Sequence, residues 1–320
     1  MNCHLYLALG RQQSMVMPSL QRLMAIGKFG WHQETSDTLL CRSFGISPQQ
    51  DWPIAAFSWL GEGGQPGNAY WLCADPVHLI LQRDHFTLSE PVPLAVARPD
   101  ADVLVASLNQ HFAAGGLQFH IGSSGRWYLQ PETPPAIATS LPEAAIGRDT
   151  SAYMPQGMEA AQWNRLLNEM QMLLFEHPIN QAREMRGELP INSIWLSGGG
   201  ILPTEQTSNN KTVYADIPLA KGLAQAANLP CLPVPDNLAA ILDKPQRDAV
   251  LVLDNAEDAE LKWFSPLLQA LRSRQISHLR IYLALHGEVL QLEAKPTDTW
   301  KFWCRVKPLE TYLNGGRIHG

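Results

Sequence analysis

The chain has 320 residues, of which 45% are hydrophobic and 17% charged, and its 24 Lys and Arg against 30 Asp and Glu give a formal net charge of −6. This composition excludes a disordered chain, and the scattered basic residues argue against a protein that reads the nucleic-acid backbone, which requires clustered cations. The length is about twice that of a typical domain, so we expect one elaborated domain or two interleaved ones.

The N-terminus and the cysteines favour a cytoplasmic protein. The first apolar run, Leu5–Leu9, lacks the basic region and the small-residue cleavage site of a secretory signal. The five cysteines are odd in number and widely spaced, without a Cys-x-x-Cys pair, which is typical of a reducing compartment. No run approaches the roughly 20 apolar residues of a membrane span. We expect a full-length cytoplasmic chain that binds neither membrane nor nucleic acid.

The predicted elements change in character along the chain. Alternating apolar residues predict strands, and apolar residues at a spacing near 3.6 predict helices. The first part contains a strand at 5–9 and helices at 18–27, 37–44 and 53–60, and ends in a linker rich in Gly and Pro at 61–67. The middle part contains a strand pair at 70–88, helices at 101–114, 159–176 and 181–186, and strands at 117–121, 126–130 and 191–196.

From residue 212 onward, strands and helices alternate. The expected strands are 212–215, 231–233, 249–253 and 278–285, and the expected helices are 219–227, 237–242 and 257–274. Alternation of this kind predicts an α/β fold with a mostly parallel sheet between helices. The middle part, which is richer in paired strands, looks inserted into it.

Three sequence features offer chemistry, each with a structural alternative. Gly198-Gly199-Gly200 follows a predicted strand, where backbone N–H groups could approach a phosphate, or where the chain could simply turn. His177, Asn180 and Arg183 bracket a helix break and could converge on a carboxylate or phosphate. The acidic residues after the strand 251–253 lie where parallel strands commonly carry ligands, although acids also suit the first turn of a helix. No serine-hydrolase elbow or histidine metal spacing occurs.

Residues 175–200 resemble the archaeal-type cofactor-independent phosphoglycerate mutases. His177, Asn180 and Arg183 match a His-Pro-Val-Asn-x-x-Arg segment of that family, and residues 187–200 are similar to its Gly-Lys-x-Pro-Ala-Asn-x-Ile-Trp-Leu-Trp-Gly-x-Gly segment. The helices beginning at Met17-Pro18 and Ile217-Pro218 follow in the family's order. The resemblance implies an alkaline phosphatase-like α/β core of residues 1–68 and 205–320, with an inserted α+β phosphoglycerate-mutase-like domain of residues 69–204.

A closer resemblance is to the RpfE-type regulatory proteins of proteobacteria. It is carried by the run from Glu188 to Gly200 and by the closing Trp300-Lys301-Phe302-Trp303. It implies a bacterial regulatory protein.

The chain departs from the mutases at the positions that hold the catalytic metals and the nucleophile. The family's first strand ends in a metal-binding Asp, where this chain has Leu9-Gly10, and its serine nucleophile lies where this chain reads Gln50-Asp51-Trp52-Pro53-Ile54-Ala55. Asp254, Glu257, Asp258 and Glu260 keep acids without the family's His. Two-metal phosphoryl transfer needs these groups. The resemblance therefore implies a pseudoenzyme with no catalytic residues and no metal cofactor.

The residues that the resemblance places on the substrate side are retained. They are His177, Asn180, Arg183, Asn192, Lys221, Gly198, Gly199 and Gly200. We expect them to bind a small phosphorylated or carboxylate anion.

Two other interpretations stay open. The chain could be an active mutase or phosphatase with an atypical Mn²⁺ or Zn²⁺ site formed by Asp254, Asp258 and His286. It could instead be a protein-interaction module whose partner meets Trp300 and Trp303.

Overall fold

The computed structural model describes residues 1–9, 16–204, 211–244, 246–285 and 287–313. The chain divides into two compact units, of which unit 1 comprises residues 1–39 and 208–320, and unit 2 comprises residues 40–207. Unit 2 is therefore inserted into the sequence of unit 1. Within the ranges described, no helix is both long and apolar enough to cross a membrane.

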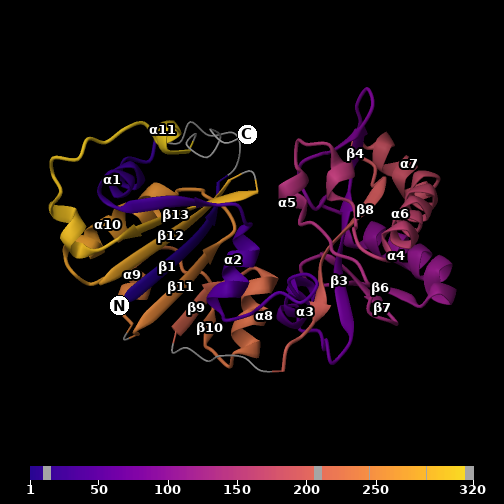
Figure 1. The fold of residues 1–320 in the computed structure, drawn as a ribbon, viewed down its shortest axis with the longest axis horizontal. Helices are drawn as coiled ribbons and strands as arrows, with labels where there is room; N and C mark the ends of the chain where they lie inside the picture. The colour runs from indigo at the N-terminus through magenta and orange to yellow at the C-terminus, as the bar shows by residue number, and fades with distance from the viewer. Residues whose placement is uncertain (10–15, 205–210, 245, 286, 314–320) are drawn as a thin grey trace. The chain divides into compact units, whose positions relative to one another are not determined.

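Unit 1 is built on a seven-stranded sheet with the order β10-β9-β11-β1-β12-β13-β2 (Figure 1). The strands are β1 (Asn2–Ala8), β2 (Lys28–His32), β9 (Lys211–Ala215), β10 (Cys231–Leu232), β11 (Asp248–Leu253), β12 (His278–Leu285) and β13 (Glu288–Ala294). The five strands from β10 to β12 pair in parallel, and β13 and β2 complete the sheet antiparallel. The predicted α/β class with a mostly parallel sheet is confirmed.

Helices pack on the sheet of unit 1 through its alternating apolar residues. Successive side chains of a strand point to opposite faces, and Leu5 and Leu7 of β1 join the core formed with α1 (Pro18–Ile26) and α10 (Ser265–Arg272). The helix α8 (Pro218–Ala226) packs on β9. The remaining helical elements of unit 1 are α9 (Ala239–Leu242), the π-helical turn η3 (Glu260–Phe264), the 3₁₀ turn η4 (Pro296–Trp300) and α11 (Leu309–Leu313).

Unit 2 contains an antiparallel four-stranded sheet with the order β6-β7-β3-β8. The strands are β3 (Tyr70–Val77), β6 (Leu117–Ile121), β7 (Trp127–Pro131) and β8 (Ser193–Ile201), and β4 (Leu79–Leu81) and β5 (Phe86–Leu88) form a separate hairpin. The helical elements are α3 (Ile54–Gly61), α4 (Arg98–Phe112), η1 (Ala113–Gly115), α5 (Pro142–Ala145), η2 (Thr150–Tyr153), α6 (Ala160–Phe175) and α7 (Pro178–Met185), while α2 (Ser36–Ser43) spans the division between the units.

The two faces of the unit 2 sheet carry different side chains. One face packs Leu72, Phe119 and Leu129 into a core with α4 and α6. On the other face, Trp59 of α3 stacks on Trp71, with ring centroids 5.0 Å apart and planes 22° apart. Aromatic stacking therefore fixes α3 on this sheet.

The structure differs from the sequence predictions at three places. Residues 28–32 form the edge strand β2, where the sequence predicts no strand. Gly198, Gly199 and Gly200 lie inside β8 and do not form a loop after it. Residues 40–68, which we expected in the α/β core, group with unit 2, because α3 packs on β3 and β8.

Candidate functional site

Asn180, one of the predicted anion-binding residues, is buried and bonded to the backbone. Its amide nitrogen donates to the carbonyl oxygens of Leu174 and Ile191, both at 2.7 Å, and its oxygen accepts from the N–H of Ile191 at 2.8 Å. The residue is only 3% exposed. Asn180 thereby joins the last turn of α6 to the segment that enters β8.

His177 lies at the N-cap of α7 with both ring nitrogens in contact. Nδ1 accepts from the N–H of Ile179 at 3.2 Å, which satisfies one of the free donors at the start of the helix. Nε2 lies 3.0 Å from the hydroxyl of Ser107 on α4. Burial lowers the pKa of His177, which favours the neutral ring that this capping bond requires.

Arg183 and Asn192 are likewise bonded within unit 2. The guanidinium of Arg183 donates to the carbonyl oxygen of Leu189 at 3.0 Å and pairs with Glu188 at 3.1 Å. The side-chain amide of Asn192 donates to the carbonyl oxygen of Leu79 at 2.8 Å and accepts from its N–H at 2.7 Å. Asn192 thus pairs with β4 as a neighbouring strand would.

The three glycines of β8 allow close packing of its neighbours. A Cβ atom at Gly200 would lie 2.6 Å from Cβ of Pro53, and one at Gly198 would lie 2.9 Å from Cβ of Ile54. A Cβ atom at Gly199 would meet the hydroxyl of Tyr70 on β3. Gly198 and Gly200 are therefore accounted for by the approach of the start of α3, and Gly199 by the Tyr70 side chain of the neighbouring strand.

Asp51 fixes the segment before α3, a contact that the sequence did not predict. Its carboxylate accepts from the N–H of Thr139 at 2.8 Å and also bonds the Thr139 hydroxyl. Burial raises the pKa of Asp51, against hydrogen bonds from Thr139 and from the backbone of Gly199 that lower it. Gln49 reinforces this link, since its amide exchanges two hydrogen bonds with the backbone of Ile201.

Lys221 is the one predicted anion-binding residue in unit 1. It lies on α8, half-buried, and makes no side-chain hydrogen bond or ion pair within the part of the chain that the structure describes. The structure brings the other predicted residues together along α7 and β8 of unit 2, where each supports the local fold. Anion binding by this set stays a prediction.

The acidic residues at the carboxyl edge of the unit 1 sheet surround a small cavity of about 220 Å³. Asp254 follows β11, and Asp216 and Asp236 follow β9 and β10. Asp258 pairs instead with Lys262 at 3.3 Å. His286 lies outside the described residues. Among those described, no three His, Cys, Asp or Glu side chains are grouped to hold a metal ion.

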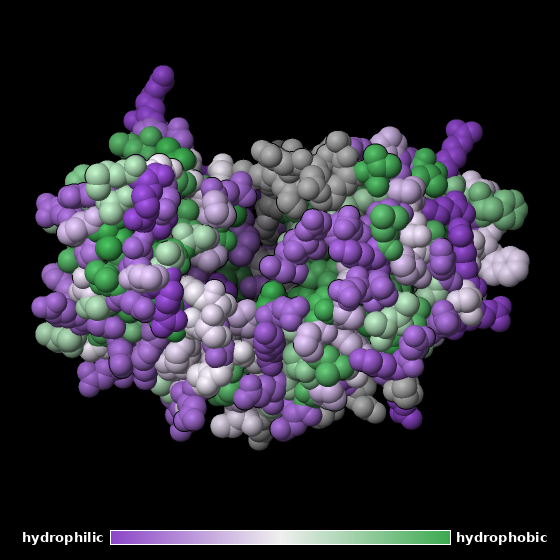
Figure 2. Space-filling model, turned by 180° about the vertical axis from the view of Figure 1, so that it is seen from behind, coloured by the Kyte–Doolittle hydropathy of each residue, from purple (hydrophilic) through white to green (hydrophobic). Residues whose placement is uncertain are grey.

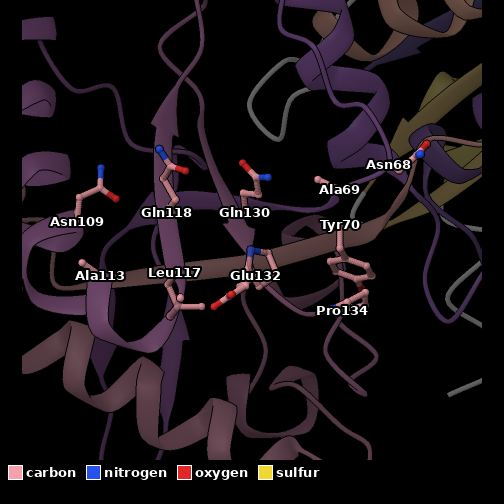
Figure 3. Close-up of a pocket in the computed structure, with 12 residues that line it drawn as sticks. Asn68, Ala69, Tyr70, Asn109, Ala113, Leu117, Gln118, Gln130, Glu132 and Pro134 are labelled. Atoms are coloured by element: carbon pink, nitrogen blue, oxygen red, sulfur yellow. The ribbon is translucent and has the colours of Figure 1, made fainter.

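A larger cavity, of about 670 Å³, lies at one end of the unit 2 sheet (Figure 3). The side chains of Gln118 and Gln130, cross-strand neighbours on β6 and β7, run side by side, while those of Leu117, Glu132 and Tyr70 extend the other way. No Lys or Arg lines this cavity. It therefore lacks the cation that usually recognises an anion.

The aromatic residues near the C-terminus are strongly exposed. Trp300, Phe302 and Trp303 are 70%, 82% and 67% exposed. Elsewhere, on the face shown in Figure 2, hydrophobic residues are scattered among hydrophilic ones. The aromatic cluster is accessible to a partner, as the interaction interpretation requires.

Comparison with known proteins gives one consistent answer. The chain is 30% identical over 209 residues to a probable 2,3-bisphosphoglycerate-independent phosphoglycerate mutase of Geobacter sulfurreducens, covering 62% of this chain and 52% of that protein. It is 24% identical over 147 residues to the corresponding mutase of Methanosarcina acetivorans, covering 44% and 37%. The chain is similar, at low identity, to cofactor-independent phosphoglycerate mutases over part of its length.

The likeness is partial. These matches span about half or less of the curated relatives' length, and no protein-family model matches the chain. Two solved structures align at low identity. They are a cofactor-independent phosphoglycerate mutase from Thermoplasma acidophilum (TM-score 0.46, 16% identity, covering 97% of this chain and 94% of that one) and the PH0037 protein from Pyrococcus horikoshii (0.47, 14%, 92% and 87%).

Proposed function

We propose that this chain is a non-catalytic relative of the mutases, a regulatory or ligand-sensing protein of the RpfE type that binds a small phosphorylated or carboxylate anion. The observation that carries the proposal is the packing at the start of α3. By the resemblance, the stretch Gln50–Ala55 stands where the mutases carry their serine nucleophile. Here Pro53 and Ile54 close against Gly200 and Gly198 of β8.

This packing supports a non-catalytic role, because the start of α3 presents apolar side chains to β8. Phosphoryl transfer needs a hydroxyl or carboxylate that can reach the phosphorus atom in line with the leaving oxygen. The first turn of α3 offers Ile54, Ala55 and Ala56, all fully buried, and Asp51 is held by Thr139. The proposal of a binding role follows from this replacement of a reactive side chain by an apolar contact.

Lys221 supports the anion part of the proposal. The residue is half-buried, and its ammonium group makes no hydrogen bond or ion pair with a described residue. A cation without such a partner attracts phosphate or carboxylate oxygens. The other predicted anion-binding residues are already bonded within unit 2. We therefore rest the ligand site on Lys221 and not on Asn180 or Arg183.

The proposal is tested by calorimetric titration of 3-phosphoglycerate, with and without Mn²⁺, combined with an assay for 2-phosphoglycerate. We expect binding without turnover, and a loss of affinity of about tenfold in Lys221→Ala, as for a charge-assisted hydrogen bond. The matched control is Lys307→Ala, which removes an exposed cation of the same unit. Turnover, or equal affinity in the two variants, would contradict the proposal.

A second candidate is an active phosphomutase or phosphatase with an atypical metal site. Of its predicted ligands, Asp254 lines the cavity at the carboxyl edge of the parallel strands, although the described residues include no group of three that could hold a metal ion. Carboxylates are ligands for Mn²⁺. Metal analysis of the purified protein decides between the candidates, since this one requires stoichiometric metal that Asp254→Asn reduces, together with turnover.

A further inference from the structure

A third cavity, of about 300 Å³, lies within unit 2. None of the predicted anion-binding residues lines it. It is bounded by the β4–β5 hairpin, the 3₁₀ turn η2, the middle of α6 and the first residue of β8. Its volume is at the lower end of the range of small-molecule sites. All of its lining residues belong to unit 2.

The lining of this cavity is acidic. Asp84 and Asp149 line it, and no Lys or Arg does so. Asp149 accepts from the N–H of Ser151 at 2.9 Å, and the hydrogen bonds from Ser151 lower its pKa, so the carboxylate is ionised at neutral pH. Asp84 lies 2.9 Å from Nδ1 of His85, which also lines the cavity. Both carboxylates are exposed, the side chain of Asp84 at 83%, and a cationic ligand in the cavity would meet them from the solvent side.

A buried hydroxyl points independently to a ligand. Ser193 lines the cavity, is only 5% exposed, and makes no side-chain hydrogen bond with any residue that the structure describes. Its oxygen is not among the fully enclosed side-chain atoms of the described residues that lack a partner, so a molecule in the cavity can reach it. A polar ligand in the cavity would satisfy the hydroxyl of Ser193.

The opposite wall supplies amides and an apolar surface. Asn168 and Gln171 lie three residues apart on α6, so their side chains share one face of the helix. Leu79, Phe86 and Leu167 also line the cavity. They can enclose the hydrocarbon part of a ligand whose polar end meets the carboxylates.

We propose that this cavity binds a small organic amine. Its ammonium group bonds Asp84 and Asp149, the hydroxyl of Ser193 and the amides of Asn168 and Gln171 complete its polar contacts, and its hydrocarbon part packs on Leu79, Phe86 and Leu167. The site takes a cation, so it is independent of the anion site proposed above and either can fail without the other.

The test is an NMR titration of the full chain with benzylamine, and with benzyl alcohol as the neutral probe of the same shape. Benzylamine should shift the amide signals of residues 84–86, 149–151 and 168–171, with an affinity about threefold to fivefold higher than that of benzyl alcohol, as expected for ion pairs with exposed carboxylates. Equal affinities of the two probes, or shifts elsewhere in the chain only, would overturn the proposal.

Variants separate the carboxylates from general charge effects. Asp149→Asn should weaken benzylamine binding several-fold and leave benzyl alcohol unchanged, and Asn keeps the capping contact with Ser151 because it is an equally good cap. Asp84→Asn should act in the same direction. Asp102→Asn, which removes an exposed carboxylate paired with Arg98 on α4, is the matched control. Unchanged benzylamine affinity in both cavity variants would refute the site.

Discussion

Replacing Asn180 by Ala should destabilise unit 2 strongly, because the side chain acts as a structural link. The change removes three hydrogen bonds of 2.7–2.8 Å to the carbonyl of Leu174 and to both backbone groups of Ile191. At about 1 kcal/mol for each bond, the expected loss in the free energy of unfolding is about 3 kcal/mol. The freed backbone groups are buried, since Leu174 and Ile191 are 1% and 0% exposed.

The assay is native-state hydrogen exchange of the Ile191 amide, which donates to Asn180. A loss of about 3 kcal/mol corresponds to a fall in protection of roughly 100-fold. Gln181→Ala, an exposed neighbour on the same helix, should change it little. If Asn180→Ala left the exchange of Ile191 unchanged but weakened 3-phosphoglycerate binding, the structural role would be refuted and the ligand role restored.

Three further outcomes follow from the same contacts. Gly200→Ala should lower the free energy of unfolding by about 1–3 kcal/mol, because the new Cβ would meet backbone and ring atoms of Pro53. Thermal melts should show this as a lower melting temperature, whereas Gly115→Ala, with open space around it, should leave the melting temperature unchanged. Burial lowers the pKa of His177, so its contribution to stability is present above about pH 6.5 and is lost as the pH falls through the folded-state pKa; His177→Asn should remove this pH dependence from thermal melts. Burial raises the pKa of Asp51, so the folded state binds more protons than the unfolded chain above about pH 3.9, and stability falls as the pH rises through the raised pKa. Denaturant titrations of Asp51→Asn should show that this fall is absent, and a variant that kept it would contradict the assignment.

The fold was predictable because its strongest signals are local. The parallel strands of unit 1 are continuous apolar runs such as Leu251–Leu253, and the long helix α6 carries Trp163, Leu167 and Met170 on one face. The edge strand β2 escaped prediction because Lys28–His32 has neither alternation nor an apolar run, and its place is fixed by pairing with β13. Sequence pattern does not encode such long-range pairing.

The sequence predicts anion-binding residues but does not show their partners. Asn180 and Asn192 are predicted to bind an anion, and in the structure their side-chain amides bond backbone groups. An amide satisfies a backbone peptide or a ligand with the same atoms, so the sequence could not distinguish the two. Asp84, Asp149 and Ser193 were missed, because a hairpin, a turn and a strand far apart in the chain come together to line the cavity.

The close fit between α3 and β8 also bears on the evolutionary history of the chain. A serine placed at position 54 would lie against Gly198 and not in open space, since Ile54 is fully buried there. Regaining a reactive group at this place would require the helix and the strand to change together, and each change alone would first lower stability. Descent from an active mutase would thus be hard to reverse one substitution at a time.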